Sequence, residues 1–103
     1  MTARRGEVWR YDPVVARRGI STLRLIVSAD PINNDRTVPV VLAVNIVETD
    51  PGSLLAVPVD EFGWANAVTV QPIMRSRLLE RMAIVTPDTM DQVSAALRAA
   101  QDL

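Results

Sequence analysis

VPVVLAVNIV, residues 38–47, carries the strongest β-strand signal in the chain. Valine and isoleucine dominate it, and β-branched residues favour extended backbone. Polar segments rich in Asp, Asn, Pro and Gly bound the stretch on both sides, at residues 30–37 and 48–53. Such segments are typical of turns. A long strand between turns predicts a small antiparallel β fold.

Shorter apolar runs flank this strand. They predict further strands at residues 7–11, 22–29, 54–59, 67–73 and 83–85. Pro58 has no backbone N–H, which favours an edge or bulge position for its strand. We expect residues 60–66 to form a loop and residues 75–82 to form one or two helical turns.

The C-terminal segment reads as a helix. Thr86 is a good cap, Pro87 suits the first position, and Asp88 favours the positive end of the helix dipole. An apolar face follows at helical spacing: Met90, Val93, Leu97 and Ala100. The predicted fold is therefore mainly β: five to six antiparallel strands curled into a small β-barrel, with a C-terminal α-helix.

Composition limits the chemistry that the chain can perform. Its 103 residues suit one domain, 1–103. There is no cysteine and no histidine, which excludes disulfides, thiolate metal sites and a Ser-His-Asp triad. The acids at positions 48, 50, 60 and 61 show no metal-ligand pattern, so we expect neither a metal nor a cofactor. With no membrane-spanning run and no secretory signal, we expect a cytoplasmic protein.

Arginine supplies all the basic residues, although the formal net charge is only −1. One group lies in the first 24 residues, and Arg75, Arg77 and Arg81 form a second. Arginine is well suited to bidentate phosphate contacts. A basic face arises if the fold joins the two groups. The alternative is that a codon preference explains the absence of lysine and that the second group covers a helix surface.

Two stretches, RRGEVWRYDP at residues 4–13 and LIVSADPIN at residues 25–33, carry a resemblance to a known family. The first is similar to the opening strand and loop of the MazF/PemK toxin family, and the second is similar to its second strand and turn. Further stretches fit later parts of the family pattern in order: VPVVLAVNI, AVTVQPI with RSRLLERM, and MDQVSAAL. The resemblance covers nearly the whole chain.

The resemblance implies an SH3-like barrel and a metal-independent endoribonuclease. It also implies a toxin of a toxin–antitoxin pair, which forms a homodimer and is held inactive by a small antitoxin protein. A basic groove can hold single-stranded RNA by its phosphates. RNA carries its own nucleophile, the 2′-hydroxyl, so the enzyme must only deprotonate it, stabilise the phosphate and protonate the leaving oxygen.

The chain departs from the family pattern at two positions. The family's catalytic arginine begins the second strand as Arg-Pro, where this chain has Thr22 and Leu23, and Arg24 comes two residues late. A Thr or Ser ends the family's third strand, where this chain has Val47, with Thr49 two residues on. Side chains two apart in a strand share a face, so Arg24 reaches the same groove about 7 Å further along.

Six residues are the candidates for the site. By resemblance, Arg24 stabilises the phosphate, and Thr49 and Thr22 orient the phosphate or the 2′-hydroxyl; the RNA-binding candidates are Arg17, Arg18 and Trp9. Each candidate also has a structural alternative. Arg24 would be a strand arginine whose stem covers apolar surface, Thr49 would form a turn, and Thr22 would simply suit a strand. The two loop arginines would be solvated charges, and the tryptophan would belong to the core or to a dimer interface.

The general base stays open between a carboxylate, a threonine-held water and the phosphate itself. The two displaced positions also leave a second function open, in which a catalytically degenerate family member acts as a protein- or nucleic-acid-binding module. Inhibition of DNA gyrase is a third reading, and it rests on fold analogy alone.

Overall fold

The computed structural model describes residues 2–12 and 20–101, with the backbone alone at residues 20 and 21. In this part of the chain, six strands form one antiparallel sheet in the order β4-β5-β3-β2-β1-β6. The strands are β1 Glu7–Tyr11, β2 Ile20–Ile26, β3 Val40–Val47, β4 Ala56–Val59, β5 Gly63–Met74 and β6 Leu78–Ile84.

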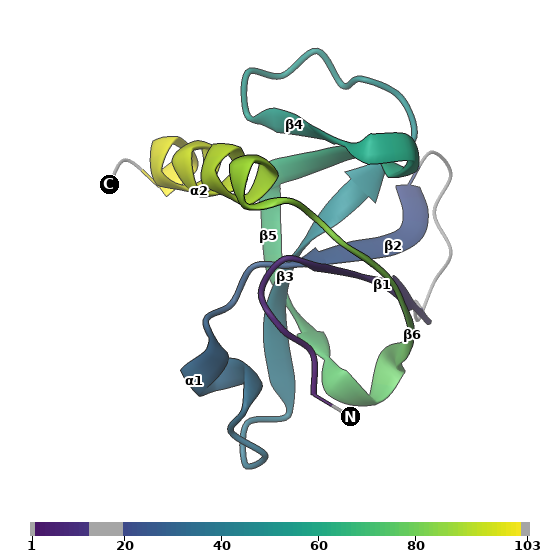
Figure 1. Ribbon diagram of the computed structural model, residues 1–103, viewed down its shortest axis with the longest axis vertical. Helices are drawn as coiled ribbons and strands as arrows, with labels where there is room; N and C mark the ends of the chain where they lie inside the picture. Colours follow the sequence, from purple (N-terminus) through teal and green to yellow (C-terminus); the bar gives the residue numbers. More distant parts are fainter. Residues whose placement is uncertain (1, 13–19, 102–103) are drawn as a thin grey trace.

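The sheet curls into the predicted barrel-like shape but does not close, because β4 and β6 remain as its two edges. Pro58 lies on the edge strand β4, as its missing N–H predicts. The helix α2, Pro87–Gln101, packs on β4 and β5, and the one-turn helix α1, Asp30–Asn33, lies at the other end of the molecule (Figure 1). The predicted mainly-β class with a C-terminal helix is confirmed.

A wide bulge divides β5 into two halves. Asn66 lies opposite Asn45 of β3, but the next pair joins Gln71 to Ala43, so β5 has four residues where β3 has one. The surplus residues disrupt the ladder locally and increase its bend. One half of β5 can therefore pack under α2 while the other half continues toward α1 (Figure 1).

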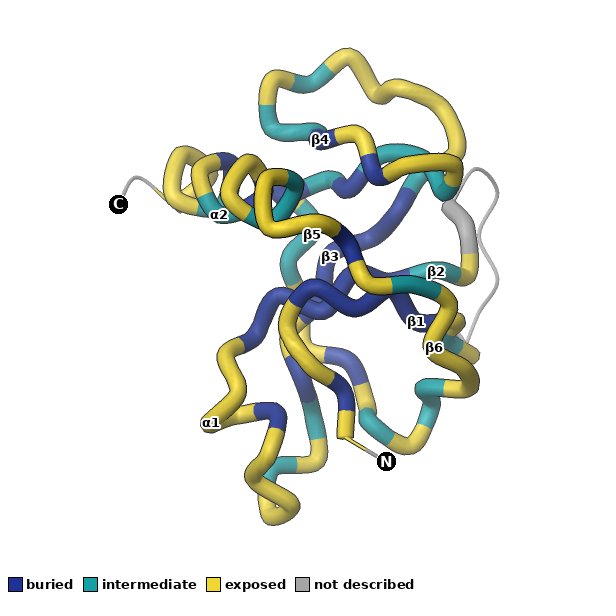
Figure 2. Tube along the Cα trace, in the orientation of Figure 1, coloured by how far each residue is buried: buried dark blue, intermediate teal, exposed yellow. Residues whose placement is uncertain are grey.

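Two apolar cores lie on opposite faces of the sheet. Neighbouring residues of a strand point to opposite faces, and Val8 and Leu25 enter the larger core beneath α2, whereas Trp9 and Ile26 enter the smaller one. Figure 2 shows the buried backbone running through the centre of the sheet. The middle strands are therefore buried on both sides.

Two local expectations are wrong. Residues 75–82 are not helical turns: Arg75–Arg77 form a short 3-10 turn (η2), and β6 begins at Leu78. Leu, Glu, Arg and Met are good helix formers, but intrinsic propensity is a weak determinant, and pairing with β1 overrides it here. The expected loop at 60–66 contains a second 3-10 turn, Asp60–Phe62 (η1), followed by the start of β5.

The expected apolar face of α2 is correct in part. Thr86 caps the helix, since its hydroxyl accepts a hydrogen bond from the Thr89 N–H at 3.2 Å. Val93 is buried, whereas Ala100 is exposed and Ala96 takes the buried position instead. The last turn of the helix, residues 98–101, is exposed.

A glycine marks the point where β5 begins. Gly63 has φ 125°, and a Cβ atom there would overlap the Val47 carbonyl oxygen of β3. Both the backbone angle and the close approach require glycine. The close approach lies at Val47, the last residue of β3, and Thr49 follows in the bend after it.

Candidate functional site

Arg24 lies in the middle of the sheet. It is on β2, opposite Trp9 of β1 and Asn45 of β3, and its exposed fraction is 7%. Its guanidinium carbon lies 5.1 Å from the centre of the Tyr11 ring, and Nη1 donates a hydrogen bond to the Leu23 carbonyl oxygen at 2.8 Å. The guanidinium is thus held by a cation–π contact and a backbone carbonyl.

Burial changes the electrostatics of this guanidinium. Loss of water lowers the pKa of Arg24 from its ordinary value, while the charge interaction with Tyr11 acts in the opposite direction. An arginine keeps its charge under these conditions because its ordinary pKa is so high. A fixed positive charge with little water around it interacts strongly with an anion.

Two amide side chains lie beside Arg24 on the same face. Gln71 Nε2 donates to Asn45 Oδ1 at 3.0 Å, which joins β5 to β3. The Asn45 N–H donates to Thr69 Oγ1 at 2.9 Å, and the Thr69 hydroxyl donates to the Asn66 carbonyl at 2.6 Å. The bulge of β5 therefore folds back on β3 and fixes the amide pair.

A buried carboxylate supports the other side of Arg24. Glu7 accepts hydrogen bonds from the Arg4 N–H at 2.7 Å and from Trp9 Nε1 at 3.1 Å. It also pairs with Arg81 of β6 at 3.1 Å. Glu7 is 3% exposed, so its charge is compensated inside the protein. These contacts fix the indole ring that lies opposite Arg24.

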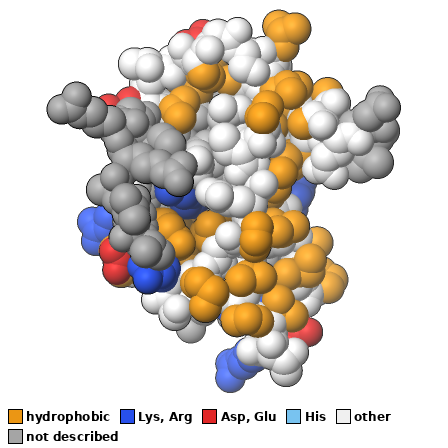
Figure 3. Space-filling view, turned by 180° about the vertical axis from the view of Figure 1, so that it is seen from behind, with side chains coloured by type: hydrophobic (Ala, Val, Ile, Leu, Met, Phe, Trp, Pro, Cys, Tyr) orange, Lys and Arg blue, Asp and Glu red, His pale blue; other side chains and the backbone are white. Residues whose placement is uncertain are grey.

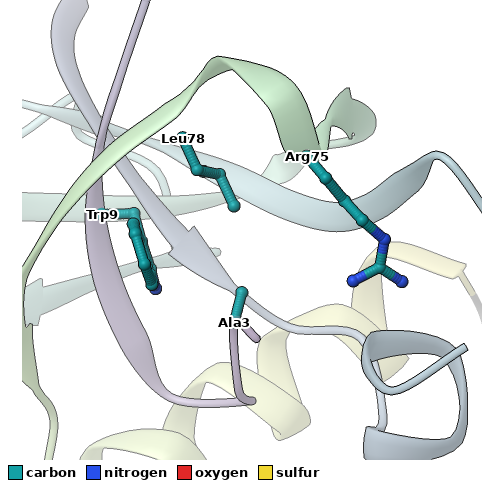
Figure 4. Close-up of a pocket in the computed structure, with 4 residues that line it drawn as sticks. All are labelled: Ala3, Trp9, Arg75 and Leu78. Carbon is teal, nitrogen blue, oxygen red and sulfur yellow. The ribbon is translucent and has the colours of Figure 1, made fainter. Parts of the chain in front are cut away.

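Trp9 is part of the smaller core, with an exposed fraction of 2%. It lines a cavity of about 100 Å³ with Ala3, Leu78 and Arg75, and Figure 4 shows the Arg75 guanidinium directed away from the other three. This volume is below the roughly 150 Å³ that admits a benzene ring. Stacking of Trp9 on a base would require the cavity to open, and that role stays a prediction.

The structure separates the two candidate threonines. Thr22 is exposed on β2, two residues before Arg24, in the stretch where the pairing of β2 with β3 shifts register. Thr49 is exposed in the bend after β3, four residues beyond the position opposite Arg24, which is roughly 13 Å along the strand direction. Arg17 and Arg18 lie outside the described residues.

Most of the described arginines have structural roles. Arg75 donates to four backbone carbonyls around the end of α1, those of residues 32, 33, 35 and 38. Arg77 donates to the Asp12 carbonyl, and Arg10 pairs with Glu80. The sheet does bring the two arginine groups together through β1 and β6, but these side chains are already engaged.

Several of the exposed large apolar side chains lie on strands of the sheet. Leu79, Met82 and Ile84 lie on the edge strand β6, and Leu42 and Met74 lie on β3 and β5. Figure 3 shows apolar side chains gathered over the lower part of the opposite view. Exposed apolar patches are typical of protein–protein interfaces.

Two negative findings concern the described residues alone. No group of three or more Asp and Glu residues is placed to hold a metal ion. Neither helix in this part of the chain is long and apolar enough to cross a bilayer.

Sequence reasoning missed the residues that surround Arg24. Asn45 was visible as the single amide in the apolar run VPVVLAVNIV, since a polar side chain in a buried strand needs a reason. Gln71 and Tyr11 carried no such signal. Their approach to Arg24 depends on the bulge of β5 and on the pairing of β1 with β2.

The match to known proteins agrees with this architecture. A model of the PemK-like, MazF-like toxins of type II toxin–antitoxin systems matches residues 4–100. The chain belongs to this family. This match confirms the prediction of a MazF/PemK-like toxin that was made from the sequence. Among curated protein sequences, none matches it significantly.

Solved structures with the same fold include two endoribonucleases from mycobacterial species. One, in complex with its cognate antitoxin, is 27% identical with a TM-score of 0.84, over 98% of this chain and 96% of that chain. The other is 28% identical with a TM-score of 0.82, and the match covers 100% of this chain and 94% of that chain. A MazE–MazF complex from Deinococcus radiodurans has a TM-score of 0.83 at 17% identity, over 100% and 99%, and shows the fold alone.

The turn motif of this PemK/MazF-like chain is structural. In SADPIN the Ser28 hydroxyl donates to Asn33 Oδ1, and Asn33 Nδ2 donates to the Ser28 carbonyl at 2.8 Å. The Leu42 N–H donates to Ser28 Oγ at 3.1 Å, so the motif ties α1 to β3. It positions the strands and contributes no group to the site around Arg24.

Proposed function

We propose that this chain is an endoribonuclease toxin that cleaves single-stranded RNA without a metal ion. The observation that carries the proposal is the placement of Arg24: a preformed cation beside Tyr11 and Asn45, with exposed Thr22 two residues before it on β2. Family membership and the two mycobacterial endoribonucleases support the proposal.

In this reaction the 2′-oxygen attacks the adjacent phosphorus and the bond from phosphorus to the 5′-oxygen breaks. The products are a 2′,3′-cyclic phosphate and a 5′-hydroxyl. The proton of the 2′-hydroxyl passes to a base, and the leaving 5′-oxygen takes up a proton. Arg24 stabilises the additional negative charge on the phosphate, and removing one such donor costs about 10²- to 10³-fold in rate.

The test compares wild type with Arg24→Ala on a long single-stranded RNA in EDTA. We expect discrete fragments that end in a cyclic phosphate from the wild type, and a loss of about 10²-fold or more in the variant. Arg10→Ala is the matched control, because Arg10 is exposed on the opposite face of β1 and pairs with Glu80. A 2′-deoxy substitution at a cleaved position should protect that position alone.

Absence of cleavage by micromolar wild-type protein, or equal cleavage by Arg24→Ala, rejects this mechanism. RNA binding without cleavage would favour the catalytically degenerate binding module instead. In that case the buried guanidinium would serve to hold the phosphate.

The proposal includes two protein partners. A cognate antitoxin is proposed because one similar endoribonuclease was solved with its own. A homodimer is proposed because Leu79, Met82 and Ile84 expose apolar surface on the edge strand β6. Sedimentation of wild type and Ile84→Asp tests the dimer, since a buried aspartate would dissociate it. We place the protein in the cytoplasm, where RNA and antitoxin are both present.

A further inference from the structure

The amide pair formed by Asn45 and Gln71 has no part in the mechanism above. Asn45 lies directly opposite Arg24, and Gln71 lies on the next strand, joined to Asn45 by the 3.0 Å hydrogen bond. Gln71 is opposite Ala43, which pairs with Ile26, so it lies two strands across from Arg24 and two residues along. Strands are about 4.8 Å apart and residues about 3.4 Å, so the backbone separation is roughly 12 Å. The pair is therefore next to a bound phosphate but separate from it.

The pair has more hydrogen-bonding capacity than the fold uses. Asn45 is 9% exposed, and its Nδ2 has no hydrogen-bond partner among the described residues. Gln71 is exposed, and within the same part of the chain its Oε1 and its second Nε2 hydrogen are also without a partner. The unused amide groups of Asn45 and Gln71 are not enclosed by the protein. They are therefore accessible to a ligand that supplies the missing partners.

The pair is also rigid. Thr69 accepts from the Asn45 N–H and donates to the Asn66 carbonyl, so the bulge of β5 closes on the strand that carries Asn45. Bulges of this kind often lie next to active sites, where they redirect a side chain. Polar groups on strands are better fixed than groups on loops, which suits them to discriminate between ligands.

We propose that Asn45 and Gln71 bind the edge of one nucleobase of the RNA whose phosphate Arg24 contacts, and that they set a base preference beside the cleaved bond. The inference rests on the proposed function. Phosphate contacts position a nucleic acid, and base contacts give specificity. A side-chain amide offers a donor and an acceptor side by side, which matches the polar edge of a base. Unstacked bases of single-stranded RNA expose such edges.

The experiment measures binding and cleavage separately. Fluorescence anisotropy gives the affinity of wild type, Gln71→Ala and Gln71→Glu for short single-stranded 2′-O-methyl RNAs, which cannot be cleaved and which differ at one base. Cleavage sites are mapped on a long unmodified RNA of mixed sequence. Gln92→Ala is the matched control, because Gln92 is also exposed but lies on α2. Thermal unfolding confirms that each variant is folded.

We expect the wild type to prefer one base at one position by about 5- to 150-fold, the range of a good bidentate contact. Gln71→Ala should lose that preference, and Gln71→Glu should change it, because a carboxylate has acceptors but no donor. Gln92→Ala should keep it. A folded Gln71→Ala that retains the wild-type preference overturns the inference and shows that the pair only joins β5 to β3.

The two proposals fail in different ways. Cleavage with a preference that Gln71→Ala leaves intact rejects the base-binding role and keeps the nuclease. Binding with a preference that Gln71→Ala abolishes, without any cleavage, rejects the nuclease and keeps the base-binding role. A wild type that neither binds nor cleaves RNA overturns both.

Discussion

Arg24 of β2 and Asn45 of β3 lie directly opposite each other, and neither is more than 9% exposed. A charged and a neutral polar side chain thus occupy the centre of two apolar strands. Such groups are costly to bury for stability alone. Their shared position is the strongest structural sign that this face of the sheet binds a ligand.

The ring of Tyr11 should be what holds the Arg24 guanidinium. Tyr11→Leu removes the cation–π contact and should lower the free energy of unfolding by about 0.5–2 kcal/mol. Tyr11→Phe keeps the ring and should stay close to wild type. Urea unfolding and the cleavage rate should both follow this order. An equal loss in the two variants would show that the hydroxyl, rather than the ring, matters.

The Glu7 carboxylate should stabilise the fold far more than an exposed acid does. Glu7→Gln weakens its bonds to Arg4, Trp9 and Arg81 and should cost about 1–3 kcal/mol. Glu80→Gln is the control, because it also breaks a pair with an arginine but at the surface, where the cost is about 0–1 kcal/mol. Denaturant unfolding gives the loss in free energy of unfolding for both variants. Equal losses in Glu7→Gln and Glu80→Gln would contradict the prediction.

Gly63 should tolerate no side chain. Gly63→Ala combines a positive φ with overlap on the Val47 carbonyl and should cost about 2–5 kcal/mol. Gly52 also has a positive φ, of 72°, but a Cβ there meets nothing within 4 Å, so Gly52→Ala should cost only about 1–2 kcal/mol. The difference between their thermal midpoints isolates the steric part. Similar midpoints would mean that β5 can shift away from β3.

Arg75 should hold the end of α1 rather than bind RNA. Arg75→Met removes its bonds to four carbonyls and should cost about 1.5–3 kcal/mol. Arg36→Met, at an exposed position close in sequence to α1, should stay within about 0.5 kcal/mol of wild type. Amide hydrogen exchange of Asn34, which donates to Asp30, should speed up only in Arg75→Met. If Arg75→Met lost RNA affinity without faster amide exchange, Arg75 would be an RNA-binding residue and not a support of α1.

Asp35 should titrate below the ordinary range of an aspartate. Hydrogen bonds from the Thr37 hydroxyl, at 2.6 Å, and from the Thr37 N–H, at 3.0 Å, lower the pKa of its carboxyl. The folded pKa lies below the unfolded one, so the stabilisation is present above the unfolded pKa and is lost as pH falls through the folded pKa. An NMR titration should show the shift in wild type and Thr37→Ser, and a smaller one in Thr37→Val.

Sequence patterns predicted what depends on local chemistry. Residues 7–11 form β1 as expected, and Pro87 begins α2 as its missing N–H favours. β6 was not predictable in this way, because helix-forming side chains at 78–82 become a strand only by pairing with β1. The candidate site shows the same contrast between features set by local sequence and features set by strand pairing. Arg24 was visible in the sequence, but its contact with Tyr11 depends on strand register.

The position of Arg24 within β2 has a consequence for local opening of the fold. The next two residues, Leu25 and Ile26, are both fully buried and enter the two cores on opposite faces. Detaching this segment would expose both cores at once, so its amide hydrogens should exchange only through global unfolding. The Arg24 guanidinium is thus attached to a segment of β2 that we expect to open only when the whole fold unfolds. Changes at Gln71 or in the surrounding loops can alter which RNA is accepted without loosening that anchor.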